Sequence, residues 1–135
     1  MTHSPDENKL VQGFRLVLEG LGLDLDSPHV KDTPRRAAKA WYHELCRGLT
    51  NEEPKITVFP SKTQEMILLR GIPIRSVCSH HLLPFYGEAA IAYIPGGNEI
   101  LGLSKLSRIA DYWSRRPQVQ EELTTQITDH VARLI

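Results

Sequence analysis

Apolar residues near the start of the chain recur at the spacing of an α-helix. Those that share this spacing are Leu10, Val11, Phe14, Val17, Leu18 and Leu21. They predict a helix that runs to about Leu21. Ser4 is its expected N-cap, with Pro5 in the first turn and Glu7 completing a capping box.

A second helix is predicted to follow Asp32. Thr33 is its expected N-cap, and Pro34 suits the first helical position. Its apolar stripe would consist of Ala37, Ala40, Trp41 and Leu45. Gly48 is the expected C-terminal stop. Residues 49–64 contain two prolines and scattered charges, and are expected to form a connecting loop with a short extended piece.

Two segments in the middle of the chain have the composition of β-strands. Residues 66–78 are expected to form one long strand with an interruption around residues 71–73, where glycine and proline occur. A second strand is expected within residues 85–95. Because the link between the two is short, we expect them to pair antiparallel across a turn.

Two further helices are predicted, one capped by Ser104 and one opened by Pro117. The last helix would carry its apolar residues on one face: Val119, Leu123, Ile127, Val131 and Leu134. This stripe runs to the end of the chain, and two strands alone cannot bury both faces of a sheet or close its edges. We therefore expect the chain to be cut from a longer protein or to depend on another chain.

Composition indicates one domain overall, with an N-terminal helical region over residues 1–64 and a second region over 65–135. The 135 residues carry 16 Lys and Arg against 16 Asp and Glu, which argues against a general nucleic-acid or membrane-surface binder. The only cysteines, Cys46 and Cys78, lie far apart, so no disulfide framework is expected and a cytoplasmic location fits. No secretory signal or membrane anchor is expected.

The candidate chemistry concentrates at the turn between the two strands. Cys78 and His81 form a C-x-x-H pair, a spacing that can aim a thiolate and an imidazole at one tetrahedral ion such as Zn²⁺. His80 lies between them and would point elsewhere, free to take part in proton transfer. Catalytic zinc sites usually have more than two protein ligands, so the pair leaves the site unfinished. A buried cysteine beside two surface histidines is the alternative.

Two basic pairs suggest a phosphate site. Arg36 and Lys39 would lie on one face in the first turns of the second helix, and Lys105 and Arg108 follow directly after Ser104. Cations oppose the macrodipole at a helix start, and a bound polyphosphate would reverse that cost. Ordinary solvated surface is the alternative.

Gln120 and Glu121 belong to a polar run, residues 118–122, expected in the first turn of the last helix. A Gln–Glu pair on a helix face can read the N1–H, amino and carbonyl edge of a guanine-like base. Glutamates also suit a helix start without any function, which is the alternative.

Several of these motifs occur in the same order in one known family. The chain resembles GTP cyclohydrolase I at residues 32–41, 76–87, 91–95, 102–105, 108–109 and 115–121. The resemblance covers nearly the whole chain. It implies an α+β T-fold with N-terminal helices, an antiparallel strand pair and a following helix pair, of which the last two strands would be missing here. It also implies a barrel formed across subunits in a toroidal homodecamer.

The family converts GTP and water to formate and 7,8-dihydroneopterin triphosphate, the first step of folate and pterin biosynthesis. By resemblance, residues 65–135 would be a truncated catalytic region, and Cys78 and His81 would be two of the three zinc ligands. The implied catalytic residues are His80, His81 and Ser104. The implied contacts to GTP are Ser104, Lys105 and Arg108 at the ribose and triphosphate, Arg36 and Lys39 from a neighbouring subunit, and Gln120 and Glu121 at the guanine.

The chain departs from the family pattern in three respects. The third zinc ligand of the family is a cysteine on a strand after the last helix, beyond Ile135. A substrate-site histidine and a triphosphate-binding arginine of that same region are also absent, and Ser79 stands where the family usually has Glu. An alternative to an active enzyme is therefore a shortened, inactive or regulatory paralogue that binds nucleotide or joins a full-length ring. A zinc-dependent interaction module unrelated to GTP would need further ligands.

Overall fold

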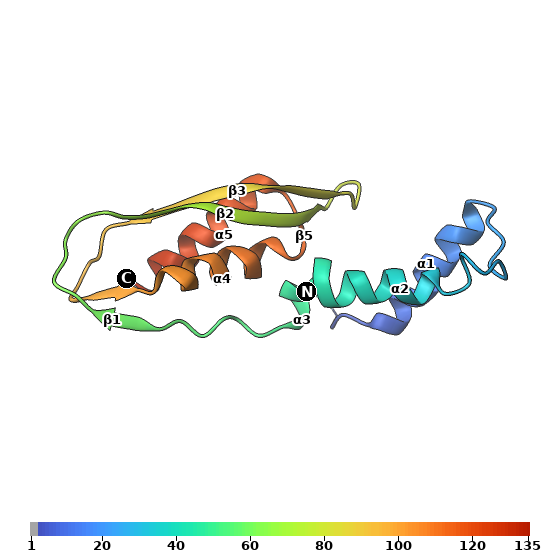
Figure 1. The fold of residues 1–135 in the computed structure, drawn as a ribbon, viewed down its shortest axis with the longest axis horizontal. Helices are drawn as coiled ribbons and strands as arrows, with labels where there is room; N and C mark the ends of the chain where they lie inside the picture. The colour runs from blue at the N-terminus through green and yellow to red at the C-terminus, as the bar shows by residue number, and fades with distance from the viewer. Residues whose placement is uncertain (1–2) are drawn as a thin grey trace.

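The computed structural model describes residues 3–135 as a small sheet covered by two helices, with a helical hairpin extending from one end (Figure 1). In chain order the elements are α1 (Glu7–Gly20), α2 (Thr33–Ala40), the π-helix η1 (Trp41–Leu45), α3 (Arg47–Thr50), β1 (Val58–Pro60), β2 (Ile67–Cys78), β3 (Pro84–Tyr93), β4 (Glu99–Leu101), α4 (Leu103–Ser114), β5 (Pro117–Gln118) and α5 (Gln120–Ala132). The three-stranded sheet has the order β3-β2-β5, and β1 pairs with β4. Within residues 3–135 no helix combines the length and apolar character needed to cross a membrane.

The long strands β2 and β3 pair antiparallel over most of their length. Val77 lies opposite Pro84 near the connecting turn, and Ile67 lies opposite Tyr93 at the other end. The register shifts once, next to Gly71, whose φ of 70° suits glycine. The predicted antiparallel pair is thus confirmed, and the predicted interruption is a β-bulge.

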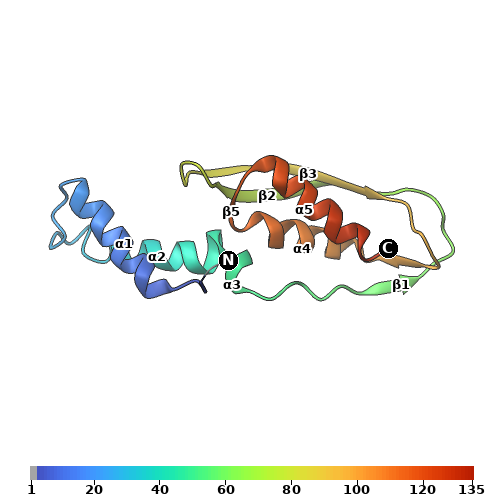
Figure 2. The same ribbon diagram turned by 180° about the vertical axis from the view of Figure 1, so that it is seen from behind.

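The core lies between this sheet and the helix pair, which Figure 2 shows from behind with α4 and α5 on the same side of the strands. Its buried residues come from β2, β3, β4, α4 and α5: Ile72, Ile74, Ile91, Tyr93, Leu101, Leu106, Ile109, Ala110, Leu123, Ile127 and Val131. The apolar stripe predicted for the last helix is confirmed, since its central residues belong to this cluster. The α+β fold predicted from the sequence is therefore present.

The start of the last helix differs from the prediction. Pro117 does not open α5; with Gln118 it forms the short strand β5, parallel to Val77 and Cys78. The helix begins only at Gln120. A proline lacks the N–H that an interior strand position needs, but it is tolerated at the first residue of a strand, as here.

The first helix begins later than predicted. Asp6, not Ser4, is the N-cap of α1, and its carboxylate accepts a hydrogen bond of 3.1 Å from the backbone N–H of Lys9. A carboxylate at this position both caps the helix and complements its dipole, which explains why the aspartate takes the role. The predicted end near Leu21 is confirmed, because Leu21 is the C-cap.

The second helix also differs at both ends. Thr33 is its first residue rather than its cap, and Asp32 is an N-cap without a side-chain hydrogen bond. Gly48 does not stop the chain's helical course, which passes through η1 into α3. Gly48 is instead buried against α4, where a Cβ would collide with the carbonyl oxygens of Tyr112 and Arg115. Glycine is needed there for close approach, not for termination.

Candidate active site

The Cys–His motif lies in a tight turn between β2 and β3. The Cys78 N–H donates to the carbonyl oxygen of Leu83, and the Leu82 N–H donates to that of Cys78, both at 2.8 Å. Leu82 adopts a left-handed conformation with a φ of 56°. His80 and His81 lie in the turn and are exposed, whereas Cys78 is half-buried. The predicted turn is therefore present.

Cys78 continues the inward-facing side of β2. Ile72, Ile74 and Ser76 are buried at alternate positions, and the next position in this series is Cys78. Its thiol is thus on the helix side of the sheet, at the sheet's end. A thiolate and a nearby imidazole from His81 fit a zinc ion in the kind of donors they offer. Within residues 3–135 no group of three or more His, Cys, Asp or Glu side chains could hold a metal, so the described chain supplies part of a donor set.

Strand β5 brings the predicted base-recognition residues to this turn. Cys78 and Gln118 are partners in the parallel ladder, and the Ser79 N–H donates to the carbonyl oxygen of Gln118 at 3.1 Å. Gln120 and Glu121 follow at the start of α5, and both are exposed. The structure therefore places the Gln–Glu pair beside the Cys–His turn, although the two are far apart in the sequence.

The residues predicted to contact the triphosphate lie at the opposite end of α4. Gly102, not Ser104, is the N-cap of this helix, and Ser104 lies in its first turn without a capping hydrogen bond. At about 1.5 Å of rise per residue, Ser104 is about 15 Å along the helix from Ser114, which precedes β5. Lys105 is next to Ser104. Within a single chain, Ser104 and Lys105 therefore lie far from the Cys–His turn.

Arg108 is exposed and lines a polar hollow of about 390 Å³ beside α3 and α4. Asp111 in the same hollow accepts hydrogen bonds from Arg47 at 2.5 Å and from Arg115 at 3.0 Å. Arg47 and Arg115 are thus engaged with a carboxylate, which leaves Arg108 as the cation of the three with no ion pair in the described chain.

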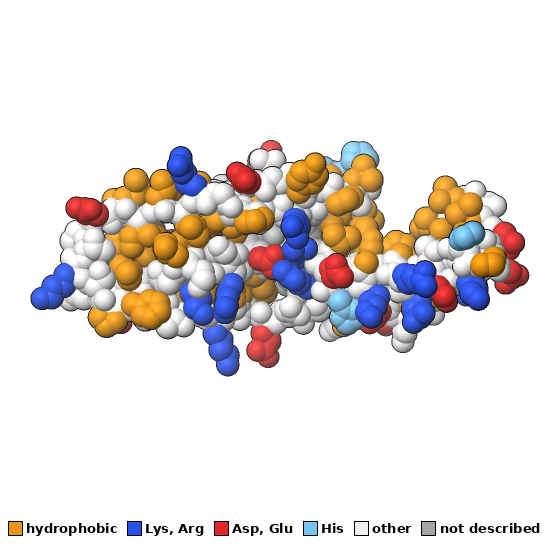
Figure 3. All heavy atoms as spheres, in the orientation of Figure 1, with side chains coloured by type: hydrophobic (Ala, Val, Ile, Leu, Met, Phe, Trp, Pro, Cys, Tyr) orange, Lys and Arg blue, Asp and Glu red, His pale blue; other side chains and the backbone are white. Residues whose placement is uncertain are grey.

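The other predicted basic pair lies on the helical hairpin. Arg36 is largely exposed, with Asp32 at 3.7 Å, and Lys39 is in the last turn of α2 rather than near its start. The predicted position of Lys39 near the helix start is therefore wrong, and its charge instead suits the helix dipole. Figure 3 shows Lys and Arg side chains along this hairpin, and Figures 1 and 2 show that the hairpin points away from the sheet. Within one chain, Arg36 and Lys39 do not meet the Cys–His turn.

The second cysteine does not complete the metal site. Cys46 is the C-cap of η1 on the hairpin side, and burial raises the pKa of its thiol. A thiol that resists ionisation is a poor metal ligand. This environment is that of a packed residue, not of a metal ligand.

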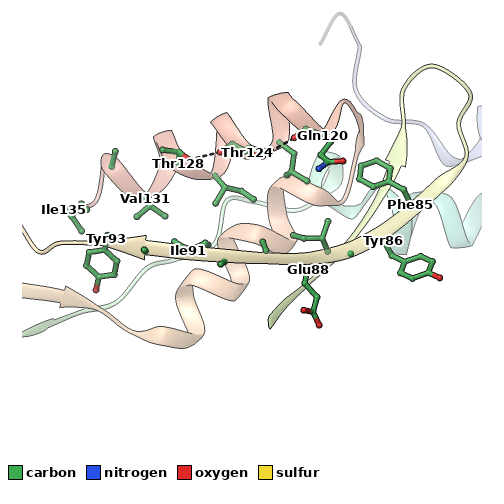
Figure 4. A pocket seen from close by; sticks show the side chains of 18 of the residues that line it. Phe85, Tyr86, Glu88, Ile91, Tyr93, Gln120, Thr124, Thr128, Val131 and Ile135 are labelled. Carbon is green, nitrogen blue, oxygen red and sulfur yellow. Dashed lines mark hydrogen bonds between the residues drawn. The ribbon is translucent and has the colours of Figure 1, made fainter. Parts of the chain in front are cut away.

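An open groove of about 650 Å³ runs between β3 and α5 (Figure 4). Phe85 and Gln120 lie at its end near the Cys–His turn, and Val131 and Ile135 lie at the other end. Within residues 3–135, β3 is the edge strand of the sheet on this side. An edge strand beside an apolar groove leaves backbone hydrogen-bonding groups available to another segment.

Some residues that support the site were not predicted from the sequence. The Ser76 hydroxyl donates to the carbonyl oxygen of Arg116 at 3.2 Å, and the guanidinium of Arg116 lies 4.8 Å and 4.6 Å from the ring centres of Tyr112 and Trp113. Arg116 also donates to the carbonyl oxygen of Gly48 at 2.8 Å. These contacts fasten the segment before β5. The arginine–aromatic spacing within 112–116 was the only available signal.

The sheet, the helix pair and the Cys–His turn define an α+β protein with a candidate zinc site at the end of a strand. The family model described as GTP cyclohydrolase I matches residues 10–135. The chain therefore belongs to the GTP cyclohydrolase I family, and its fold agrees with the T-fold expected for that family.

Curated relatives agree with the family model. The chain is 44% identical over 128 residues to GTP cyclohydrolase 1 of Carboxydothermus hydrogenoformans, covering 93% of this chain and 66% of the relative. It is 48% identical over 127 residues to the protein of that name from Hahella chejuensis, with coverages of 92% and 66%. For Brevibacillus brevis the values are 43% over 130 residues, with 95% and 69%. The chain thus spans about two thirds of the length of these relatives.

Proposed function

We propose that the protein carries out the GTP cyclohydrolase I reaction, the hydrolytic opening of the GTP imidazole ring to give formate and 7,8-dihydroneopterin triphosphate. This would be the first step of folate and pterin biosynthesis. The observation that carries the proposal is the bridge between Cys78 and Gln118, which sets the start of α5 beside the Cys–His turn. Residues 65–135 would be the catalytic region.

The guanine would bind at the start of α5. Glu121 offers a carboxylate to the N1–H and amino group, and Gln120 offers an amide to the carbonyl edge. Both side chains are exposed and free to reach a ligand. With the pyrimidine edge of guanine held there, its imidazole ring would face the neighbouring Cys–His turn. C8 would then react because the bound base places it next to that turn.

Cys78 and His81 would hold zinc, together with a ligand from outside the described residues. When bound, the ion supplies Lewis-acid activation of water near neutral pH. His80 lies in the same turn and is exposed, so its imidazole can give or take a proton at the opening ring. We infer that Ser104, Lys105 and Arg108 bind the ribose and triphosphate.

A single chain does not assemble all of these groups, so we propose that the protein acts as a homo-oligomer, a decamer by family resemblance. Arg36 and Lys39 lie on a hairpin that points away from their own Cys–His turn, which suits contacts to the triphosphate of a neighbouring copy. The apolar residues of α1 support such contacts, since none of them is buried within the chain. Two unpaired cysteines favour the cytosol as the compartment.

The alternative of a non-catalytic, shortened paralogue is not favoured by the comparisons, because the relatives named above are all described as GTP cyclohydrolase 1. The test compares zinc content and GTP-dependent formate release of the wild type with those of Cys78→Ser and Cys46→Ser. We expect Cys78→Ser to lose both zinc and formate release, because serine is a poor zinc ligand. Cys46→Ser is the matched control and should retain both. Equal zinc content in the two variants would contradict the proposed site.

A further inference from the structure

Gln118 is the residue at which three parts of the candidate site meet. Its side-chain Nε2 donates to the carbonyl oxygen of Trp113 in the last turn of α4. Its main-chain oxygen accepts the N–H of Ser79, the residue after Cys78, at 3.1 Å. Two residues further along the chain, Gln120 begins α5. One residue therefore ties α4, the Cys–His turn and the base-recognition residues together.

The amide of Gln118 has unused hydrogen-bonding capacity. The residue is only 4% exposed, and its Oε1 is buried without a partner among residues 3–135. Partners in a parallel ladder lie about 4.8 Å apart with side chains on the same face, so this amide lies beside the side chain of Cys78. Buried acceptors without a donor are rare in folded proteins. Its oxygen is thus available to a donor that arrives when the site is occupied.

The segment before Gln118 is held by side-chain contacts, whereas α5 after it is held by the packing of Leu123, Ile127 and Val131. Arg116 is fastened by the Ser76 hydroxyl and by its position against two aromatic rings. In contrast, Val119, the N-cap of α5, supplies no side-chain hydrogen bond to the helix. The hydrogen bonds of Gln118 therefore act together with this packing to set where Gln120 and Glu121 lie relative to Cys78.

We propose that Gln118 is a positioning residue, which holds the base-recognition turn of α5 against the Cys78–His81 turn. The proposal rests on the proposed function for its catalytic consequence, and on the hydrogen bonds of Gln118 for its structural one. Loss of the amide would remove the bond to the Trp113 carbonyl oxygen. The main chain at Gln118, whose oxygen accepts the Ser79 N–H, would then be less restrained, and the base would shift relative to the turn. Gln120 and Glu121 would still bind the base. The expected kinetic signature is a lower kcat with a nearly unchanged KM for GTP.

The test uses Gln118→Met, which keeps the length of the side chain and removes the amide. Gln126→Met is the matched control, since the Oε1 of Gln126 is also buried and unpartnered among the described residues, but Gln126 lies within α5, away from the ladder. For Gln118→Met we expect hydrogen exchange of the Ser79 N–H to be about tenfold faster. We also expect kcat to fall about tenfold, with KM for GTP within about twofold. The control should stay within about twofold of the wild type throughout.

Unchanged Ser79 exchange in a folded Gln118→Met variant would overturn the inference, as would an equal effect in the control. If the wild type releases no formate, the proposed function fails, and Ser79 exchange still decides whether Gln118 positions the turn. Melting curves establish that both variants fold. If Gln118→Met does not fold, Gln118→Leu carries the same comparison, because it also removes the amide and adds no charge to this buried position.

Discussion

The two cysteines, Cys78 and Cys46, show how far the role of a thiol can be predicted from sequence. The C-x-x-H spacing singled out Cys78, and the structure adds that it ends a strand on the inward face and pairs with Gln118. Cys46 also has a histidine at this spacing, His43, but His43 pairs with Glu7 at 3.0 Å and burial raises the pKa of the Cys46 thiol. Spacing alone therefore does not separate the two thiols; the difference comes from burial and from the partner of the histidine, which the sequence does not record.

The two glutamates at the start of α5 allow a direct test of base recognition. Glu121 and Glu122 are both exposed in the first turn of the same helix, so they contribute similarly to the helix dipole. We expect Glu121→Ala to raise the KM for GTP by about tenfold to a hundredfold and to reduce the preference for GTP over ATP, because charged hydrogen bonds to the base are lost. Steady-state kinetics with both nucleotides measure this.

Glu122→Ala is the control for that experiment and should leave both quantities within about twofold, because only the dipole interaction is lost. An unchanged preference for GTP in Glu121→Ala, or an equal effect in the two variants, would remove Glu121 from the base-recognition pair.

At the scale of elements, the helices and the strand pair could be predicted because their periodicities are strong, but their ends could not. Pro117 was expected to start a helix, but it begins β5 because it pairs with Val77 of β2. That partner is distant in the sequence, so local preference could not indicate the pairing. Gly48 gave a helix-stop signal and instead allows α3 to approach α4. In both cases a tertiary contact overrides a local preference, and β5, the element that assembles the candidate site, was missed for this reason.

A buried histidine links α5 to the segment before β1. His130 is 2% exposed; its Nδ1 accepts the indole N–H of Trp113 at 2.9 Å, and its Nε2 lies 3.0 Å from a carboxylate oxygen of Glu53. Burial lowers the pKa of His130, an effect that Glu53 opposes and Arg133 reinforces. The neutral imidazole is therefore the form that the fold accommodates, since protonation of Nδ1 would remove the acceptor for Trp113.

Folding stability should consequently depend on pH through His130. A lowered pKa in the folded state means that its contribution is fully present above the ordinary value of 6.5 and is lost as the pH falls from 6.5 toward the folded value. We expect His130→Ala to lower the free energy of unfolding by about 1–3 kcal/mol near pH 7, because Trp113 and Glu53 lose their partner. Urea unfolding monitored between pH 5 and 8 measures both effects.

His43 provides the control for this prediction. It pairs with Glu7 at 3.0 Å, but its side chain is 52% exposed. His43→Ala should therefore change the free energy of unfolding by less than about 1 kcal/mol. A His130→Ala variant with the same stability and the same pH dependence as His43→Ala would show that the buried contacts are not stabilising.

At the scale of the whole molecule, the position of the hairpin determines what one chain can do. The family resemblance implied that Arg36 and Lys39 reach the triphosphate of a neighbouring subunit. The structure adds that they lie on a hairpin directed away from the sheet of their own chain. The apolar groove along β3 likewise becomes visible only at this scale (Figure 4).

An oligomeric site can be tested by mixing two inactive variants. Arg36→Ala would lack its contact to a neighbouring site, and Cys78→Ser would lack its own metal ligand. If Arg36 acts across an interface, random mixing of dissociated and reassembled variants should restore up to about a quarter of the sites, each formed from the intact parts of two chains. Formate release by the mixture measures this. Activity no greater than the sum of the separate variants would place Arg36 outside a shared site.

We propose that the Cys78–His81 turn and the start of α5 form one site that opens the imidazole ring of GTP. GTP labelled with carbon-13 at C8, followed by nuclear magnetic resonance with the purified chain and added zinc, tests this. We expect the label to leave the base and appear in formate, while the remaining product keeps the triphosphate. Labelled GTP that is bound by the protein but stays intact would show that the two parts do not form such a site.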